Sequence, residues 1–342
     1  MKDIWSMAAG IICLLMILGM ILAPGRCPAA EAVVVYTSAD QVYSEPVFEE
    51  FHRQTGIVVK PVYDVEASKT TGLVNRLIAE TAKPRCDVFW NSEIGSMIVL
   101  KNKGVLDIYR SPSAAGILEL FRDADGFWTG FGARARVLVY NTTLLKESDV
   151  PRSILELTDP KWRGRVAMAY PLFGTTATHV AALFCALGQQ KAEAFLTGLN
   201  TNAVVIVNGN SVVRDLVAEG KLPLGITDTD DVNVARLQGR PVGMLYPDHD
   251  GLGTLLIPNT AALVRGAPHP DLARRFMDYL LSPETESRLA FSESAQMPLR
   301  KGAERPAHVP DPATVTPMRV DYGAVAEAME SAAGFCRNLF TR

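Results

Sequence analysis

The chain has 342 residues with 34 basic and 37 acidic side chains, so its formal net charge is −3 at pH 7. A balance this close to neutral gives no long-range attraction to nucleic acid or to an anionic membrane surface. The length is sufficient for one large hydrophobic core or two medium-sized domains, so stability requires neither disulfides nor a structural metal.

The first 32 residues have the layout of a bacterial export signal. Lys2 precedes an uncharged run over 7–23, and Ala-Glu-Ala at 30–32 offers a cleavage site of the Ala-x-Ala type. An uncleaved membrane anchor is the alternative, because 17 uncharged residues are at the short end of what spans a bilayer. Lipidation at Cys27 ranks third. All three readings place the folded part outside the cytoplasm, and we expect a cleaved signal peptide and a periplasmic protein.

Three cysteines follow this signal, namely Cys86, Cys185 and Cys336. Their number and spacing fit neither a C-x-x-C motif nor a zinc site. One disulfide can form in an oxidising compartment, but the sequence does not indicate which pair.

The segment after the signal alternates between strands and helices. Hydrophobic spacing predicts strands at 33–36, 57–62 and 87–90, with helices around 47–51 and 73–78. This order is typical of a parallel sheet covered by helices, in which ligands bind outside the carboxyl ends of the strands. Those ends are Thr37 to Asp40 and Asn91 to Glu93, and both are polar.

Two extended stretches, 134–140 and 253–264, enclose a segment with its own alternation. It contains predicted strands at 165–169, 203–207 and 223–227 and helices at 175–187 and 211–220. A segment that leaves one domain and returns through two crossovers makes a discontinuous two-domain α/β protein. We therefore predict a first lobe of 33–135 and 258–342 and a second lobe of 136–257. After the crossovers come a helical region at 268–290, a proline-rich strap at 298–317 and a last helix at 322–340.

Six segments in order resemble a known family. They are VVVYTSAD (33–40), CDVFWNSE (86–93), GARARVLVYNT (132–142), LTDPKWRGRVAMAYP (157–171), GNSVV (209–213) and APHPDLARRFMDYLLSPETESRLA (267–290). In these motifs the chain resembles the periplasmic solute-binding proteins of ABC importers, in the branch with the ferric-ion binding proteins. The resemblance implies a type II periplasmic-binding fold, with two lobes, each a mixed sheet flanked by helices, joined by two hinge strands. It also implies a ligand held between the lobes, delivery to a membrane permease, and no catalysis.

One stretch departs from the family pattern. The ferric-ion binding relatives bind iron through two adjacent tyrosines after a strand of the second lobe, and the corresponding stretch 225–231 contains no tyrosine. Thr229 and Asp230 align with those places, Asp40 with a histidine of some relatives, and Ser92 or Glu93 with their glutamate. The resemblance therefore does not extend to tyrosine-ligated iron.

Acidic side chains suggest a site for a cation. Asp228 and Asp230 are two residues apart at a predicted strand end, so they point to one side, and Asp40 and Glu93 complete a predicted ring of oxygens from the other lobe. Hard cations prefer such oxygen ligands, and Ca²⁺, Fe³⁺ or an amine fits the ring. The alternative is that Asp230 or Asp231 caps the following helix.

Hydroxyl and amide side chains suggest a site for an anion. Such residues recur where strands or loops enter helices, and free backbone N–H groups there bind phosphate, phosphonate, carboxylate or carbonate. The predicted ligand residues of this kind are Thr37, Ser38, Asn91, Thr175, Thr176, Asn210 and Ser211. Arg134 or Arg136 is expected to add a bidentate clamp. For any one serine or threonine, ordinary helix capping is the alternative.

Together the two sets suit either a metal ion with a synergistic anion, such as Fe³⁺ or another hard cation, or a zwitterion such as an aminophosphonate. The sequence leaves both open. We expect a monomer without an obligatory cofactor, whose partners are this ligand and an ABC permease, with no nucleic acid. An exported enzyme on the same scaffold and a ligand-sensing module for a membrane receptor are the alternatives. Neither H-E-x-x-H nor G-x-S-x-G is present to support an enzyme.

Overall fold

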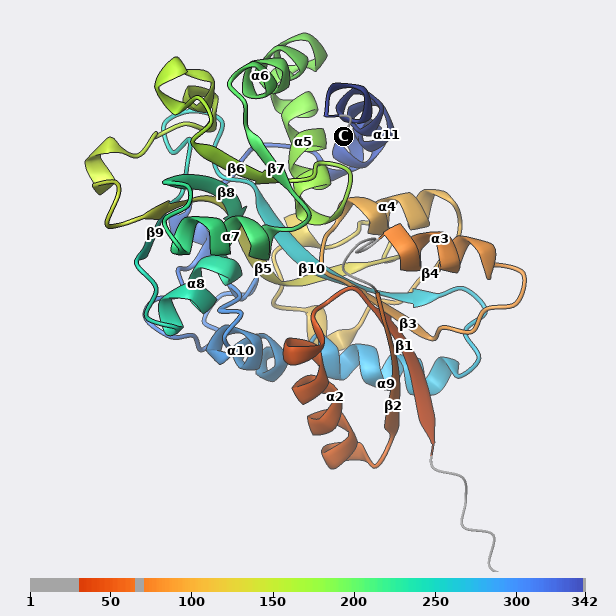
Figure 1. Ribbon diagram of the computed structural model, residues 1–342. Helices are drawn as coiled ribbons and strands as arrows, with labels where there is room; N and C mark the ends of the chain where they lie inside the picture. Colours follow the sequence, from red (N-terminus) through yellow and green to blue (C-terminus); the bar gives the residue numbers. More distant parts are fainter. Residues whose placement is uncertain (1–30, 65–70, 341–342) are drawn as a thin grey trace, which may run out of the picture. The chain divides into compact units, whose positions relative to one another are not determined.

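The computed structural model describes residues 31–64 and 71–340 (Figure 1). Residues 1–30, and with them nearly all of the predicted export signal and the lipidation candidate Cys27, lie outside this range. Among the described residues, no helix has the length and apolar character needed to span a bilayer.

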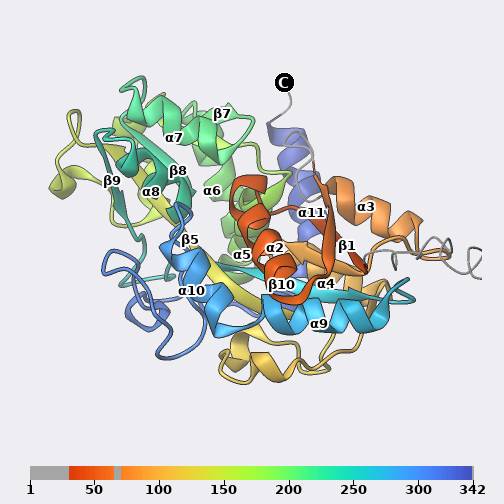
Figure 2. The same cartoon turned by 90° about the horizontal axis from the view of Figure 1, so that it is seen from below.

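The first elements confirm the predicted alternation. Strands β1 (Ala32–Thr37), β2 (Val58–Tyr63) and β3 (Val88–Asn91) run parallel, with β1 between the other two. The helices that connect and follow them are α2 (Gln41–Thr55), α3 (Thr71–Ala79) and α4 (Gly95–Asn102). In Figures 1 and 2, α2 lies on one side of these strands and α3 and α4 lie on the other, so helices cover both faces.

One long strand runs through both halves of the sheet. All 13 residues of β5 (Thr129–Asn141) are buried. Its first part, Thr129 to Ala135, pairs antiparallel with β10 (Leu256–Val264), and its second part, Arg136 to Tyr140, pairs antiparallel with β8 (Leu224–Asp228). The partner of β5 thus changes between Ala135 and Arg136. The lobe limits 33–135, 136–257 and 258–342 stay a prediction.

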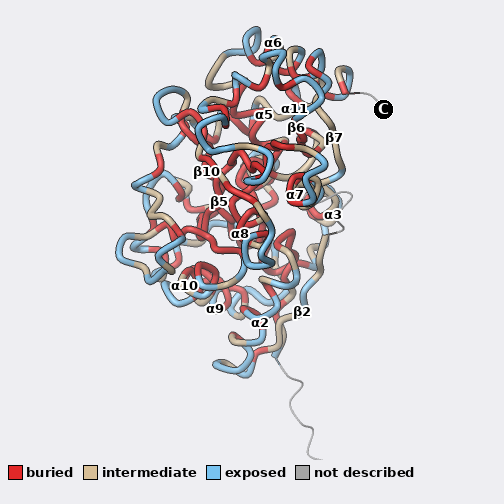
Figure 3. The backbone as a smooth tube through the Cα atoms, turned by 60° about the vertical axis from the view of Figure 1, so that its left-hand side comes forward, coloured by how far each residue is buried: buried red, intermediate tan, exposed pale blue. Residues whose placement is uncertain are grey.

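The second half repeats the parallel pattern. Strands β6 (Val166–Ala169), β7 (Val205–Val207) and β8 are parallel, and the order across the sheet is β2-β1-β3-β10-β5-β8-β6-β7. Short strands β4 (Leu106–Asp107) and β9 (Val242–Leu245) pair with β10 and β5. The helices of this half are α5 (Gly174–Leu187), α6 (Gln189–Thr201), α7 (Asn210–Ala218) and α8 (Thr229–Leu237). The central strands β5 and β10 consist of buried residues, which are red in Figure 3.

The helical region predicted at 268–290 is two helices, α9 (Pro270–Leu280) and α10 (Pro283–Phe291). Pro283 cannot donate the backbone hydrogen bond that would continue α9. Ser282 instead caps α10, accepting a 3.2 Å hydrogen bond from the Thr285 amide. The last helix, α11 (Tyr322–Leu339), packs against both α4 and α5 and so contacts helices of both halves (Figure 1).

The three cysteines of the folded part are free thiols, with Cys86 and Cys336 buried and Cys185 half-buried. No disulfide forms among them. Cys86 lies just before β3, whereas Cys185 and Cys336 belong to α5 and α11.

Candidate functional site

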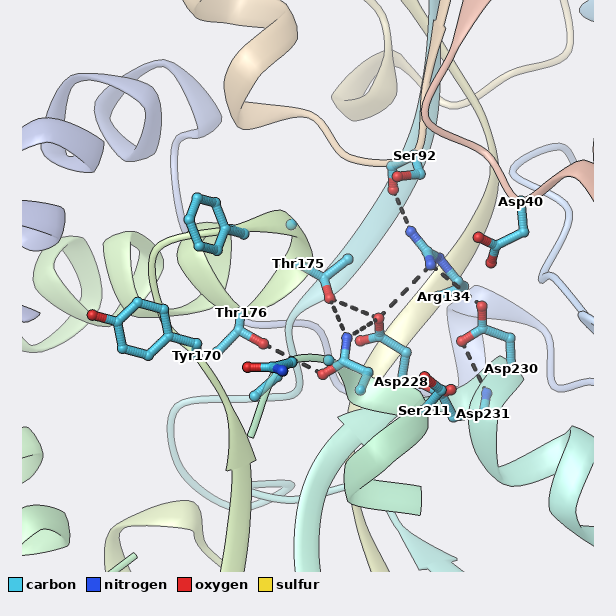
Figure 4. A pocket seen from close by; sticks show the side chains of 16 residues that line it. Asp40, Ser92, Arg134, Tyr170, Thr175, Thr176, Ser211, Asp228, Asp230 and Asp231 are labelled. Atoms are coloured by element: carbon cyan, nitrogen blue, oxygen red, sulfur yellow. Dashed lines mark hydrogen bonds and ion pairs between the residues drawn. The ribbon is translucent and has the colours of Figure 1, made fainter. Parts of the chain in front are cut away.

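A pocket of about 260 Å³ lies where the two halves of the sheet meet (Figure 4). Most of its wall comes from the carboxyl ends of β6 and β8 and from the starts of α5, α7 and α8, while Asp40, Ser92 and Arg134 come from the other side. The lining residues are Asp40, Ser92, Arg134, Ala169, Tyr170, Phe173, Gly174, Thr175, Thr176, Asn208, Gly209, Asn210, Ser211, Asp228, Asp230 and Asp231. This is the strand-end location where ligands bind in open α/β sheets.

Helix starts border this pocket. The N-cap residues of α2, α5, α7 and α8 are Asp40, Phe173, Gly209 and Asp228, and no side-chain cap hydrogen bond is formed at any of the four. The first N–H groups of a helix have no partner within the helix and carry partial positive charge. Each helix start stabilises an anion by only about 0.3 to 1 kcal/mol at an exposed site. Several starts at one pocket therefore favour an anion more strongly than a single start does.

Arg134 links the two halves of the pocket. Its side chain is 9% exposed, and Nη1 lies 3.3 Å from Asp230 Oδ2 and 3.7 Å from Asp228 Oδ2. Nη2 donates a short hydrogen bond to the carbonyl of Ser92 after β3. Burial disfavours the charged form of Arg134. The attraction of the Asp230 and Asp228 carboxylates is larger than this effect, so the pKa of the guanidinium is raised above its usual value. Arg134 therefore stays charged in the pocket wall (Figure 4).

Asp228 is held by side chains of the protein itself. Its Oδ1 accepts a 2.7 Å hydrogen bond from Arg136, and its Oδ2 accepts hydrogen bonds from Thr175 at 2.7 Å and Asn210 at 3.0 Å. Burial acts to raise the pKa of Asp228, but Arg136 and Arg134 overcome this effect and lower the pKa below its ordinary value. Asp228 is therefore ionised at neutral pH.

Three carboxylates form a cluster at the start of α8. Asp228, Asp230 and Asp231 each offer one oxygen, and these oxygens lie within 4.8 Å of one another. The Asp231 side chain is 13% exposed; it accepts a 2.8 Å hydrogen bond from Thr227 and lies 3.8 Å from Arg214. Burial and the charges of Asp230 and Asp228 raise the pKa of Asp231 to about 8. Asp231 therefore keeps its proton to a higher pH than an ordinary aspartate does.

Eight of the sequence-predicted residues line the pocket, namely Asp40, Arg134, Thr175, Thr176, Asn210, Ser211, Asp228 and Asp230. Four others do not line it: Thr37, Ser38, Asn91 and Glu93 are buried and are hydrogen-bonded within the protein. Glu93 accepts hydrogen bonds from the Ser96 amide at the start of α4 at 3.0 Å and from Thr178 of α5 at 2.9 Å. The predicted ring of Asp40, Glu93, Asp228 and Asp230 therefore differs from the observed cluster, in which Asp231 joins Asp228 and Asp230.

The sequence analysis missed the aromatic part of the wall. Tyr170 and Phe173 lie between β6 and α5, with ring centroids 6.1 Å apart. In Figure 4 the Tyr170 ring lies on the opposite side of the view from Asp40 and Asp230, and its hydroxyl points away from them. The signal was available for Tyr170, which directly follows the strand predicted at 165–169 as Thr37 and Asn91 follow theirs; Phe173 lies in the short connection to the helix predicted at 175–187.

The chain is similar to known binding proteins over most of its length. It is 26% identical over 282 residues to the major ferric iron-binding protein of Neisseria meningitidis serogroup A, covering 80% of this chain and 82% of that protein. It is also 26% identical over 314 residues to a putative 2-aminoethylphosphonate-binding periplasmic protein of Salmonella typhi, covering 88% and 85%.

Solved structures show the same fold. The structure of iron-bound HitA from Pseudomonas aeruginosa matches with a TM-score of 0.82 and 26% identity, covering 91% of this chain and 99% of that one. The predicted two-lobed periplasmic-binding fold is thereby confirmed. Residues 87–323, more than half of the chain, match the family model of bacterial extracellular solute-binding proteins. The protein thus belongs to this family, and it is a solute-binding protein rather than an enzyme.

Proposed function

We propose that the protein captures a small zwitterionic solute, with an anionic group of the phosphonate type and an amine, in the pocket described above. One observation carries the proposal: a single pocket joins the uncapped starts of α5 and α7 to the carboxylates of Asp40 and Asp230. The helix starts favour the anionic end of such a solute. The carboxylates favour its amine.

The charges around the pocket support an organic solute over a bare metal ion. Each acid of the cluster has an arginine nearby: Arg136 at 2.7 Å from Asp228, Arg134 at 3.3 Å from Asp230 and Arg214 at 3.8 Å from Asp231. A highly charged cation would have to displace these guanidinium groups or lie close to them. An aminophosphonate, whose ammonium group offsets part of its anionic charge, adds far less charge to this set of acids and arginines than a highly charged metal ion does.

The size of the pocket agrees with this choice. Its volume of about 260 Å³ exceeds that of one water molecule, about 30 Å³ in the liquid, several-fold. A single ion would fill only a small part of it. The Salmonella typhi relative, named for 2-aminoethylphosphonate, supports this solute class for the present chain.

A hard cation with a synergistic anion is the second candidate, favoured by the carboxylate cluster of Asp228, Asp230 and Asp231. In that case the carboxylates would hold the metal, and the starts of α5 and α7 would hold its anion. The Neisseria meningitidis and Pseudomonas aeruginosa proteins named for iron support this alternative.

We place this capture in the periplasm, after cleavage of the export signal at residues 1–32, with an ABC permease as recipient. The expected carrier is a monomer.

Closure of the two lobes is a population shift, because a ligand that contacts both lobes stabilises the closed state. Moving that balance from 1:99 to 99:1 takes roughly 5.5 kcal/mol of differential affinity.

Titration calorimetry of the protein without its export signal tests the proposal. The panel contains 2-aminoethylphosphonate, ethylphosphonate, ethylamine and Fe³⁺ with citrate. We expect the aminophosphonate to bind more tightly than either half-molecule, because only the zwitterion meets both sides of the pocket. Tight binding of Fe³⁺ with citrate and none of the aminophosphonate would select the metal alternative.

A further inference from the structure

A buried arginine lies beneath the pocket and reaches three elements of its wall. The Arg136 side chain is 1% exposed, and Arg136 is not among the lining residues. Its Nη1 donates to Asp228 Oδ1 at 2.7 Å, to Thr175 Oγ1 at 3.2 Å and to Asn210 Oδ1 at 3.2 Å. Its Nη2 donates to Thr176 Oγ1 at 3.4 Å. One guanidinium group on β5 thus joins the end of β8 to the first turns of α5 and α7.

The partners of Arg136 also bond one another. An asparagine amide has two N–H donors, and those of Asn210 go to Thr175 Oγ1 at 2.8 Å and to Asp228 Oδ2 at 3.0 Å. The hydroxyl of Thr175, its only side-chain donor, donates to Asp228 Oδ2 at 2.7 Å. A ligand cannot receive a hydrogen bond from either side chain unless this network opens.

We infer that Arg136, Asp228, Thr175 and Asn210 are positioning residues, which hold the starts of α5 and α7 side by side and leave ligand contact to other groups. The inference rests on the proposed function for the anionic end of the ligand. The contacts then fall to the first-turn N–H groups of the two helices, to Ser211 and to Arg134. The sequence analysis predicts ligand contact for Thr175, Asn210 and Asp228. In this inference these three side chains do not contact the ligand but hold the N–H groups, Ser211 and Arg134 in place.

The cost of burying the ion pair supports a positioning role. Arg136 and Asp228 are both nearly inaccessible, at 1% and 2% exposure of their side chains. Such a pair adds little stability over apolar residues of similar size, because desolvation offsets its attraction. The nearby His179 adds no charge, since burial and Arg136 lower the pKa of His179 to about 3.

The test uses a double variant, Arg136→Met with Asp228→Asn, which removes both charges together and leaves neither unpaired. Hydrogen exchange is measured by mass spectrometry on the ligand-free protein. We expect exchange in the first hydrogen-bonded turns of α5 (177–181) and α7 (213–217) to become at least about tenfold faster, with β1 and β3 unchanged. The N–H groups before Ala177 and Val213 have no partner within their helices, so they do not report on this change. Affinity for 2-aminoethylphosphonate should fall in parallel.

Two further variants keep the test decisive. Asn210→Ala removes the amide without touching the ion pair, and should speed exchange in the same two segments even if the double variant does not fold. Ser211→Ala should weaken 2-aminoethylphosphonate binding without changing exchange at either helix start. Unchanged exchange in the Asn210→Ala protein would overturn the inference. Failure of the wild-type protein to bind the aminophosphonate would overturn the proposed function alone, because the exchange measurement needs no ligand.

Discussion

The ion pair between Arg134 and Asp230 offers the most direct mutational test of the site. Both side chains are about one-tenth exposed and line the pocket. We predict that Arg134→Ala with Asp230→Ala weakens 2-aminoethylphosphonate binding by about 100-fold, because charged hydrogen bonds contribute about 1.5 to 3 kcal/mol each. The double variant removes both members of the ion pair, so neither charge is left buried without its partner. The unfolding free energy should therefore change by less than about 1.5 kcal/mol. Calorimetry and urea unfolding measure the two quantities.

A matched ion pair on α9 provides the control. Arg274 and Asp271 lie 2.9 Å apart and are largely exposed. Their double alanine variant should bind the solute as the wild type does. Equal losses in both double variants would show that the effect at Arg134 and Asp230 does not come from the pocket.

The protonation of Asp231 predicts how stability depends on pH. An ordinary aspartate has a pKa of about 3.9, whereas Asp231 has a pKa of about 8 in the folded protein. Between these values the folded state binds more protons than the unfolded state, so this group lowers stability as pH rises from about 4 to 8. The slope contributed is at most about 1.4 kcal/mol per pH unit.

Unfolding in urea at several pH values, with Asp231→Asn as the comparison, measures this contribution. The variant should show a flatter dependence than the wild type between pH 5 and 8, since its side chain does not titrate. Parallel curves for the two proteins would mean that Asp231 is ionised throughout this range.

At the scale of elements, Glu93 joins α4 to α5. Its carboxylate is buried and accepts hydrogen bonds from Asn91 at 2.9 Å, the Ser96 amide at 3.0 Å and Thr178 at 2.9 Å. We predict that Thr178→Val lowers the unfolding free energy by about 1 to 2 kcal/mol, because it removes one hydrogen bond to a buried charge. Thermal unfolding checks this value. Glu49→Gln, an exposed change on α2, is the control and should have no effect; a stable Thr178→Val protein would exclude the contact as a support between the helices.

Sequence patterns predicted the order of these elements well. Alternating apolar runs located β1 to β3 and the starts of α5 and α7, and strand ends and helix starts led to seven of the lining residues. The eighth, Arg134, was predicted separately as a clamp. Sequence patterns did not predict where a side chain points when its partners come from distant parts of the chain. Glu93 follows a strand as Asp228 does, but it turns toward the start of α4 and Thr178, and only the fold brings Thr178 near. Pro283 divides the single helical region predicted at 268–290 into α9 and α10.

For the molecule as a whole, we expect capture to depend on the two halves of the sheet that meet at the pocket. Arg134 contacts Ser92 on one side and Asp230 on the other, and α11 packs against helices of both halves. Each side alone offers weak interactions, so we expect the affinity for the proposed solute to come from contacts with both sides. This arrangement follows from a sheet in which β5 pairs first with β10 and then with β8.

The most direct measurement is a crystal structure of the protein as isolated from the periplasm of its own host, with its natural ligand retained. We expect density for a small organic solute whose anionic group faces the starts of α5 and α7 and whose amine faces Asp40 and Asp230. A single metal ion held by Asp228, Asp230 and Asp231 without such a solute, or a solute bound outside this pocket, would rule out the proposed function.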